Sequence, residues 1–175
     1  MVENGQVKRL LALLALLGTS AVAGGREPMS PRPAFIGSSQ LNSLKDAAFD
    51  RAFMGWFISQ AKVGETMANS TMYGAMNTQV KAFGRQVKTT RSTSIARLRG
   101  WGGGQFAIID IVGPQKNYDE WFLTYLPRHN EQLRQLLNLV PSHTRNANLR
   151  QFATQLHRTL EREDAQSSEL LKVLK

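Results

Sequence analysis

The chain has 175 residues, of which 42% are apolar and 20% are charged, and its formal net charge is +9. A chain of this length and composition can bury its own core as a single globular domain. The absence of cysteine excludes a disulfide framework, thiolate metal sites, cysteine nucleophiles and a lipid-anchored N-terminal cysteine.

Residues 1–23 have the pattern of a secretory signal peptide. Lys8 and Arg9 precede an apolar stretch over residues 10–17, which is short for a membrane span, and Ala21-Val22-Ala23 supplies small residues before a cut. The polar Gly-Gly-Arg-Glu that follows favours cleavage over the alternative, an uncleaved anchor helix. The pattern predicts a periplasmic or secreted protein, with the signal peptide as its only membrane segment.

Cleavage would remove two basic residues and one acidic residue, so the formal charge falls from +9 to +8. Anionic lipid, acidic polymers and nucleic acid all attract a protein of this charge, and export makes nucleic acid the least favoured of them. The alternative is a basic surface that is merely solvated.

Residues 24–43 contain a cluster of prolines and are predicted to form a flexible leader. Ser43 and the acidic Asp46 indicate a helix start near Leu44. Apolar residues then recur at helical spacing in two segments, about 44–69 and 80–101, which predicts a first helical hairpin over residues 44–101. The residues that set this spacing are Phe49, Phe53, Phe57, Val63, Met67, Val80, Phe83, Val87, Ile95, Leu98 and Trp101.

Residues 102–116 are predicted to cross from the first hairpin to a second hairpin over 117–174. The crossover opens with three glycines and contains a β-branched run over 108–112, which we interpret as an extended segment, since one strand has no partner in a helical chain. The third helix should run from about Asn117 to Val140, kinked at Pro127 and stopped by Pro141. The fourth helix should take about residues 145–174.

The two hairpins align without a gap at a shift of 69 positions. Eight residues are then identical over 49–98, where composition alone gives about three. The identical pairs are Asp50/Asp119, Phe53/Phe122, Asn69/Asn138, Asn77/Asn146, Phe83/Phe152, Gln86/Gln155, Thr90/Thr159 and Ala96/Ala165. The pattern indicates an internal duplication, and two hairpins with one apolar face each predict an all-α four-helix bundle.

Several motifs resemble an exported bacterial family called domain of unknown function 305. The similar residues are Phe49-Asp50-x-x-Phe53-x-x-x-Phe57-Ile58, Arg91-x-x-Ser94-Ile95-x-x-Leu98-x-x-Trp101 and Tyr118-Asp119-x-x-Phe122-Leu123-x-x-Leu126-x-x-His129. Val80-x-x-Phe83 and Leu149-x-x-Phe152-Ala153 are equally similar to a sister family, domain of unknown function 4142. The resemblance implies a ferritin-like bundle.

The resemblance also implies where a metal site would lie, and this chain departs from it. The paired histidines of the family, which some members use for copper or another metal, fall on Gln60 and Ala61, and the family's glutamate falls on Ser94. In the second hairpin the same rows hold His129 and Glu163. Two ligands fall short of the three or four that zinc or copper normally requires.

His129 and Glu163 therefore have two interpretations, a residual metal or proton site and a hydrogen-bonded structural pair. We expect both side chains to lie within hydrogen-bond or single-water distance in a polar layer with Gln60, Ser94 and Arg91, where Arg91 pairs with Glu163 in place of a metal.

Lys81, Arg85 and Lys88, together with Arg91, recur at helical spacing and could form a basic face. No motif of a nucleotide-binding or hydrolytic site is present. We therefore expect a non-enzymatic exported bundle without a cofactor, which binds a partner protein or an anionic envelope component through this face. The alternative is a periplasmic protein that binds copper or zinc through His129 and Glu163. The sequence does not fix the oligomeric state.

Overall fold

The computed structural model describes residues 38–104 and 115–174 of the chain. The predicted signal peptide over 1–23, most of the predicted leader and the central part of the crossover lie outside these ranges.

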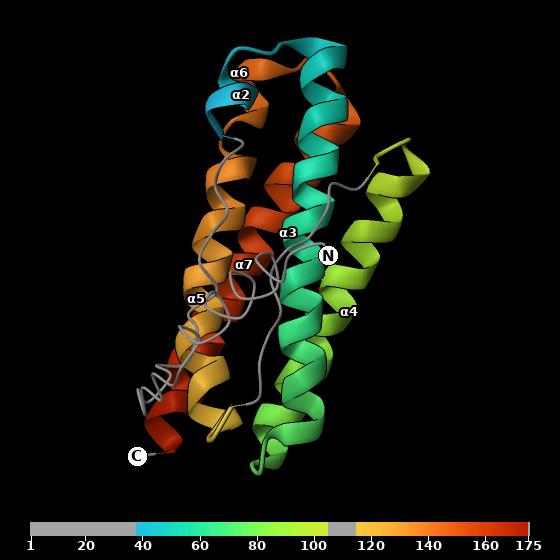
Figure 1. The fold of residues 1–175 in the computed structure, drawn as a ribbon. Coiled ribbons are helices and arrows are strands. Elements are labelled where there is room, and N and C mark those ends of the chain that lie inside the picture. Colours follow the sequence, from blue (N-terminus) through green and yellow to red (C-terminus); the bar gives the residue numbers. More distant parts are fainter. Residues whose placement is uncertain (1–37, 105–114, 175) are drawn as a thin grey trace, which may run out of the picture.

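The described residues form an all-α bundle, as the apolar spacing predicts (Figure 1). Its long helices are α3 (Asp46–Gly74), α4 (Thr78–Gly100), α5 (Tyr118–Leu137) and α7 (Ala147–Val173). Two short helices, α2 (Ser38–Asn42) and α6 (Val140–His143), cover one end. Within the described ranges, no helix is long and apolar enough to cross a membrane.

The long helices pair as two hairpins. α3 packs on α4, α5 packs on α7, and the hairpins meet mainly through α3 and α5, while α4 and α7 touch only lightly. α4 ends at the end of the bundle opposite to the start of α5, so the connection between the hairpins joins opposite ends (Figure 1). This topology agrees with the predicted crossover.

Equivalent residues of the two hairpins have equivalent roles at the turns. Asn77 caps α4, with its side-chain oxygen accepting from the backbone N–H groups of Gln79 and Val80. Asn146 lies 69 positions later and caps α7 by accepting from the N–H of Leu149 at 3.2 Å. Asparagine is among the best N-cap residues, because its oxygen satisfies an N–H group that the helix leaves free.

Each turn is also closed by a carboxylate of the other hairpin. Asp119 on α5 accepts from the backbone N–H groups of Met76 and Asn77 at 2.8 and 3.0 Å. Asp50 on α3 accepts from the side-chain amide of Asn146 at 3.1 Å. These reciprocal contacts support the internal duplication.

A polar layer divides the core into two apolar clusters. One cluster, near α2 and α6, contains Phe49, Phe53, Phe57, Leu98, Phe152, Leu156 and Leu160, and the other contains Met67, Val80, Phe83, Val87, Phe122 and Leu126. Every phenylalanine that the sequence places on a core face is buried. The four-helix core therefore follows the predicted stripes.

Three predicted details of the first hairpin and the turns are wrong. Residues 38–42 of the expected flexible leader form α2, and its Leu41 is fully buried. Ser43 does not cap α3: its hydroxyl donates to the carbonyl of Gln40, and Lys45 holds the cap position without a side-chain hydrogen bond. α5 ends at Leu137, before Pro141, which instead lies in the first turn of α6, where proline loses no helical hydrogen bond.

Candidate functional site

The centre of the bundle holds a buried ion pair from facing helices. Arg91 of α4 is 0% exposed and Glu163 of α7 is 1% exposed. The guanidinium donates to both carboxylate oxygens, at 3.2 and 2.7 Å, and so forms the two-pronged geometry that a planar guanidinium favours. The ion pair that the sequence predicts is therefore present.

Asn130 of α5 completes the pair. Its side-chain oxygen accepts from Arg91 at 2.5 Å, and its amide nitrogen donates to Glu163 at 3.3 Å and to Asp164 at 2.7 Å. The neutral side chain of Asn130 thus forms hydrogen bonds with both the guanidinium and the carboxylate. Buried charged groups need such partners to offset the loss of water.

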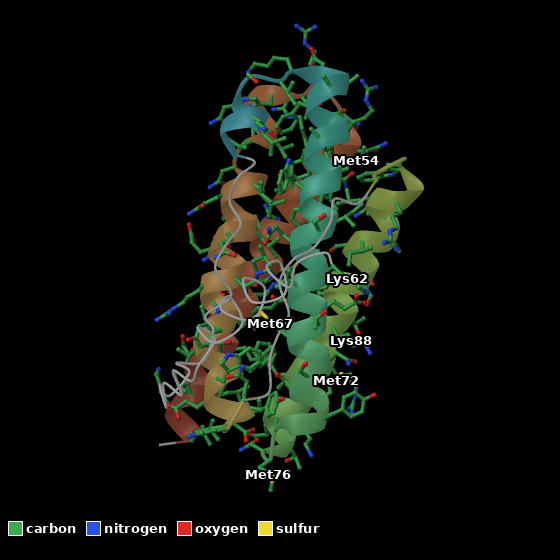
Figure 2. The ribbon with its side chains drawn as sticks, in the orientation of Figure 1. Met54, Lys62, Met67, Met72, Met76 and Lys88 are labelled. Atoms are coloured by element: carbon green, nitrogen blue, oxygen red, sulfur yellow. The ribbon has the colours of Figure 1, made fainter. Side chains whose placement is uncertain are left out.

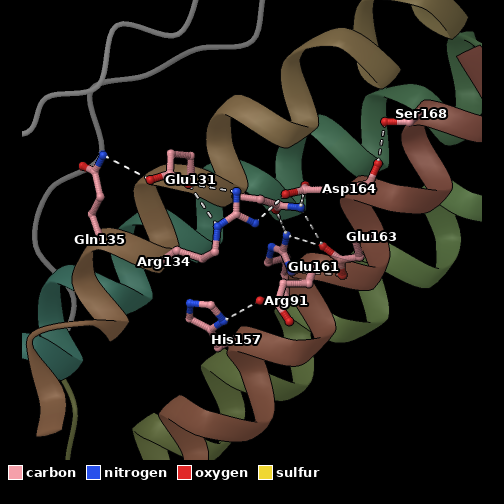
Figure 3. Close-up of polar contacts among 10 residues, drawn as sticks. Arg91, Glu131, Arg134, Gln135, His157, Glu161, Glu163, Asp164 and Ser168 are labelled. Carbon is pink, nitrogen blue, oxygen red and sulfur yellow. Dashed lines mark hydrogen bonds and ion pairs between the residues drawn. The ribbon is translucent and has the colours of Figure 1, made fainter.

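From this pair a chain of polar contacts runs outward between α5 and α7 (Figure 3). Asp164 forms an ion pair with Arg134, which also bonds to Glu131 at the surface. The amide of Asn130 separates the two carboxylates of Glu163 and Asp164, and each carboxylate is paired with its own arginine.

His129 lies in the same layer but does not pair with Glu163. Within the described part of the chain its Nε2 atom has no hydrogen-bond partner, and the same holds for Nε of Arg91. Both atoms face Gly64 of α3: a Cβ at Gly64 would lie 2.7 Å from Nε2 of His129 and 3.1 Å from Nε of Arg91. Glycine here lets the α3 backbone approach the polar layer.

The surroundings of His129 keep its imidazole neutral. Burial and then the charge of Arg91 lower the pKa of His129 from 6.5 to about 3, against a side-chain hydrogen bond with Gln132 that acts to raise it. The expected direct hydrogen bond between His129 and Glu163 is wrong, since Arg91 and Asn130 donate to the carboxylate and Nε2 of His129 has no partner among the described residues.

This neutral histidine predicts a pH-dependent stability. In the unfolded chain His129 takes up a proton near its ordinary pKa of 6.5, whereas in the folded protein it does so only near 3. The folded state is therefore destabilised as pH falls below 6.5, by about 2 kcal/mol between pH 7 and pH 5. Urea denaturation at these two pH values should show a smaller loss in His129→Gln, which keeps His143 and His157. Equal losses in the two proteins would contradict the assignment.

The other predicted members of the layer contribute less. Ser94 is buried, but its hydroxyl donates to the carbonyl of Thr90 in its own helix at 2.8 Å. Gln60 is only half-buried on α3, and no hydrogen bond joins it to Arg91, His129 or Glu163 in the described part of the protein. The layer is therefore built from α4, α5 and α7.

The donor set fits a transition metal poorly. Among the described residues no three His, Cys, Asp or Glu side chains come together to hold an ion. Both oxygens of Glu163 already accept from Arg91, and a fixed cation beside His129 opposes the approach of a second cation.

The basic face on α4 keeps three of its four predicted members. Arg85 is exposed, Lys81 is half-buried, and Lys88 is half-buried and donates to Asn69 of α3 at 2.8 Å. Arg91 points into the core instead. Lys88 lies on the α3–α4 side of the bundle with Lys62 (Figure 2), where Glu65 pairs with Lys62. α4 itself contains no acidic residue.

Comparison with known proteins gives a likeness of fold. The chain is similar in structure to CopM, solved in its silver-bound form, with a TM-score of 0.62 and 14% sequence identity over 70% of this chain and 95% of that chain. No model of a protein family matches the chain, and a search of curated proteins found no match. The likeness confirms a helical-bundle fold.

Proposed function

We propose that this protein is an exported, non-catalytic helical bundle that binds an anionic component of the cell envelope through the basic face of α4, formed by Lys81, Arg85 and Lys88. The observation that carries the proposal is the charge of α4: the helix contains six basic residues and no acidic residue, and Lys81, Arg85 and Lys88 are half-buried or exposed. A row of cations on one helix attracts polyanions.

The buried layer has a structural role in this proposal. Arg91, Glu163 and Asp164 each have a partner of opposite charge, and the neutral His129 lies beside a cation. Such a layer fixes the register of the helices, because a shift of one helix would leave an unpaired charge in the core.

Binding to an immobilised sulfated polysaccharide tests the proposal without reference to a particular ligand. Lys81→Gln/Arg85→Gln/Lys88→Gln should weaken binding of the mature protein by about a hundredfold, at about 1 kcal/mol for each cation near an anionic surface. The matched control is Arg150→Gln/Arg158→Gln/Arg162→Gln, which removes the same charge from exposed positions of α7. If both triple variants lose the same amount of binding, the net charge alone explains the binding, and the assignment to α4 is wrong. If the protein binds an acidic protein but not the polysaccharide, the ligand of the basic face is a partner protein instead of an envelope component.

Metal handling is the second candidate, favoured by the fold that this chain shares with the silver-bound CopM. His129 and Glu163 would be its ligands. Calorimetric titration with copper, silver and zinc ions separates the two functions. We expect negligible binding, because Arg91 occupies the carboxylate. Stoichiometric binding that disappears in His129→Ala would establish the metal site instead.

A further inference from the structure

The exposed large apolar side chains of the described residues gather at one end of the bundle. They are Tyr73 and Met76 at the turn between α3 and α4, 78% and 86% exposed, and Val173 and Leu174 at the end of α7, 70% and 36% exposed. The α3–α4 turn and the end of α7 lie at the same, lower end in Figure 1, and Met76 marks the tip in Figure 2. An apolar cluster of this kind marks an interaction surface.

The tip is held rigidly, so its apolar side chains project from a fixed backbone. Asp119 accepts from the backbone N–H groups of Met76 and Asn77, and the preceding Ala75 is buried. The ring of Tyr118 lies directly over Gly74, where a Cβ would come within 2.3 Å of it. Tyr73 and Met76 are thus presented outward while the backbone around them is fixed.

Three lysines lie near this apolar tip. Lys116 lies just before α5, Lys81 is in the first turn of α4 and Lys172 is in the last turn of α7. Lys81 is about 5 Å and Arg85 about 11 Å along the helix axis from the start of α4, at 1.5 Å per residue. Three acidic residues lie at the same end: the carboxylate of Asp119 accepts from two backbone N–H groups, Glu120 accepts from the side-chain amide of Asn117, and Glu169 is paired with Lys172.

We propose that this end of the bundle docks on an anionic lipid surface, with Tyr73 and Met76 entering the headgroup region and Lys81 and Lys116 contacting lipid phosphates. An aromatic and a thioether side chain flanked by lysines suit the boundary between headgroups and acyl chains. The inference rests on the proposed function and specifies its anionic component as lipid.

Flotation with vesicles tests the docking, comparing phosphatidylglycerol mixed into phosphatidylcholine with phosphatidylcholine alone. The protein should bind the mixed vesicles only. Tyr73→Ser/Met76→Ser should weaken that binding by about tenfold, and Lys81→Gln/Lys116→Gln by about twentyfold. Arg51→Gln/Arg145→Gln removes two exposed cations from the opposite end and should change binding by less than about threefold.

The absence of cysteine allows a direct readout of orientation. Met76→Cys labelled with an environment-sensitive fluorophore should shift to the blue on mixed vesicles, whereas Ala48→Cys, exposed in the first turn of α3, should not. The protein could bind vesicles without a shift of either label, and Tyr73→Ser/Met76→Ser could bind as well as the unchanged protein. That result would show that this end of the bundle does not dock, while binding through the basic face of α4 would remain. Binding to the sulfated polysaccharide but not to vesicles also overturns this inference alone. Loss of both kinds of binding overturns the proposed function with it.

Discussion

Replacing Arg91 with methionine should lower the free energy of unfolding by about 3–5 kcal/mol, because it leaves the carboxylate of Glu163 buried without its cation. Asn130 remains as a hydrogen-bond donor to Glu163, but a single amide does not neutralise a charge. Urea denaturation at pH 7, followed by circular dichroism, measures the loss.

Two further variants show whether the loss comes from the unpaired charge. Arg91→Met/Glu163→Leu removes both charges and should recover much of the stability, since an apolar pair of similar volume replaces a buried ion pair at little cost. Arg97→Met removes an exposed arginine of the same helix and should change stability by less than about 0.5 kcal/mol. A loss below 1 kcal/mol in Arg91→Met would show that the layer is solvated.

Truncating Phe83 or Phe152 to alanine should cost about 3–5 kcal/mol each. These residues are equivalent in the two hairpins and are buried in different apolar clusters: the Phe83 ring lies 5.7 Å from that of Phe122, and the Phe152 ring lies 5.5 Å from that of Phe57. Denaturation with urea should therefore show losses of similar size.

Tyr73→Ala is the matched control for these truncations, because its aromatic ring is exposed. It should change the free energy of unfolding by no more than about 0.5 kcal/mol. A cost below 1 kcal/mol for either phenylalanine would mean that its helix face is not part of the core.

The helices and their buried faces could be predicted because their signals are periodic and local. A period of 3.6 residues places Phe53, Phe83, Phe122 and Phe152 on the buried faces of their helices, and this prediction does not depend on the conformation of the turns. The shift of 69 positions also identifies Asn77 and Asn146 as equivalent, and their shared role as N-caps explains why asparagine stands at both.

The start of α3 could not be predicted in the same way. Ser43 is a good cap residue, but Asp46 adopts a φ of 45°, and the chain before it folds back as α2. That arrangement depends on the burial of Leu41 against the bundle, which is a tertiary contact. Local propensity carries no information about such a contact.

The polar layer was predictable in its charges but not in its hydrogen bonds. A single cation and a single carboxylate at equal depth in a core must pair, which leads to Arg91 and Glu163. Whether His129 or Asn130 then bonds to the carboxylate depends on the rotation of α5 by one residue. Asn130 had one signal: it aligns with the buried Ala61, so a polar side chain there must find a partner inside.

The reciprocal carboxylate contacts at the turns make each hairpin depend on the other. Met76 and Asn77 of the first hairpin donate to Asp119 of the second, and Asn146 of the second donates to Asp50 of the first. A hairpin on its own would lose these acceptors, and the first would keep Arg91 without Glu163. If the halves arose by duplication, the ancestral hairpin would have met these needs in a pair of identical chains. The equivalent helices now differ in charge, since α4 has no acidic residue whereas α7 has four.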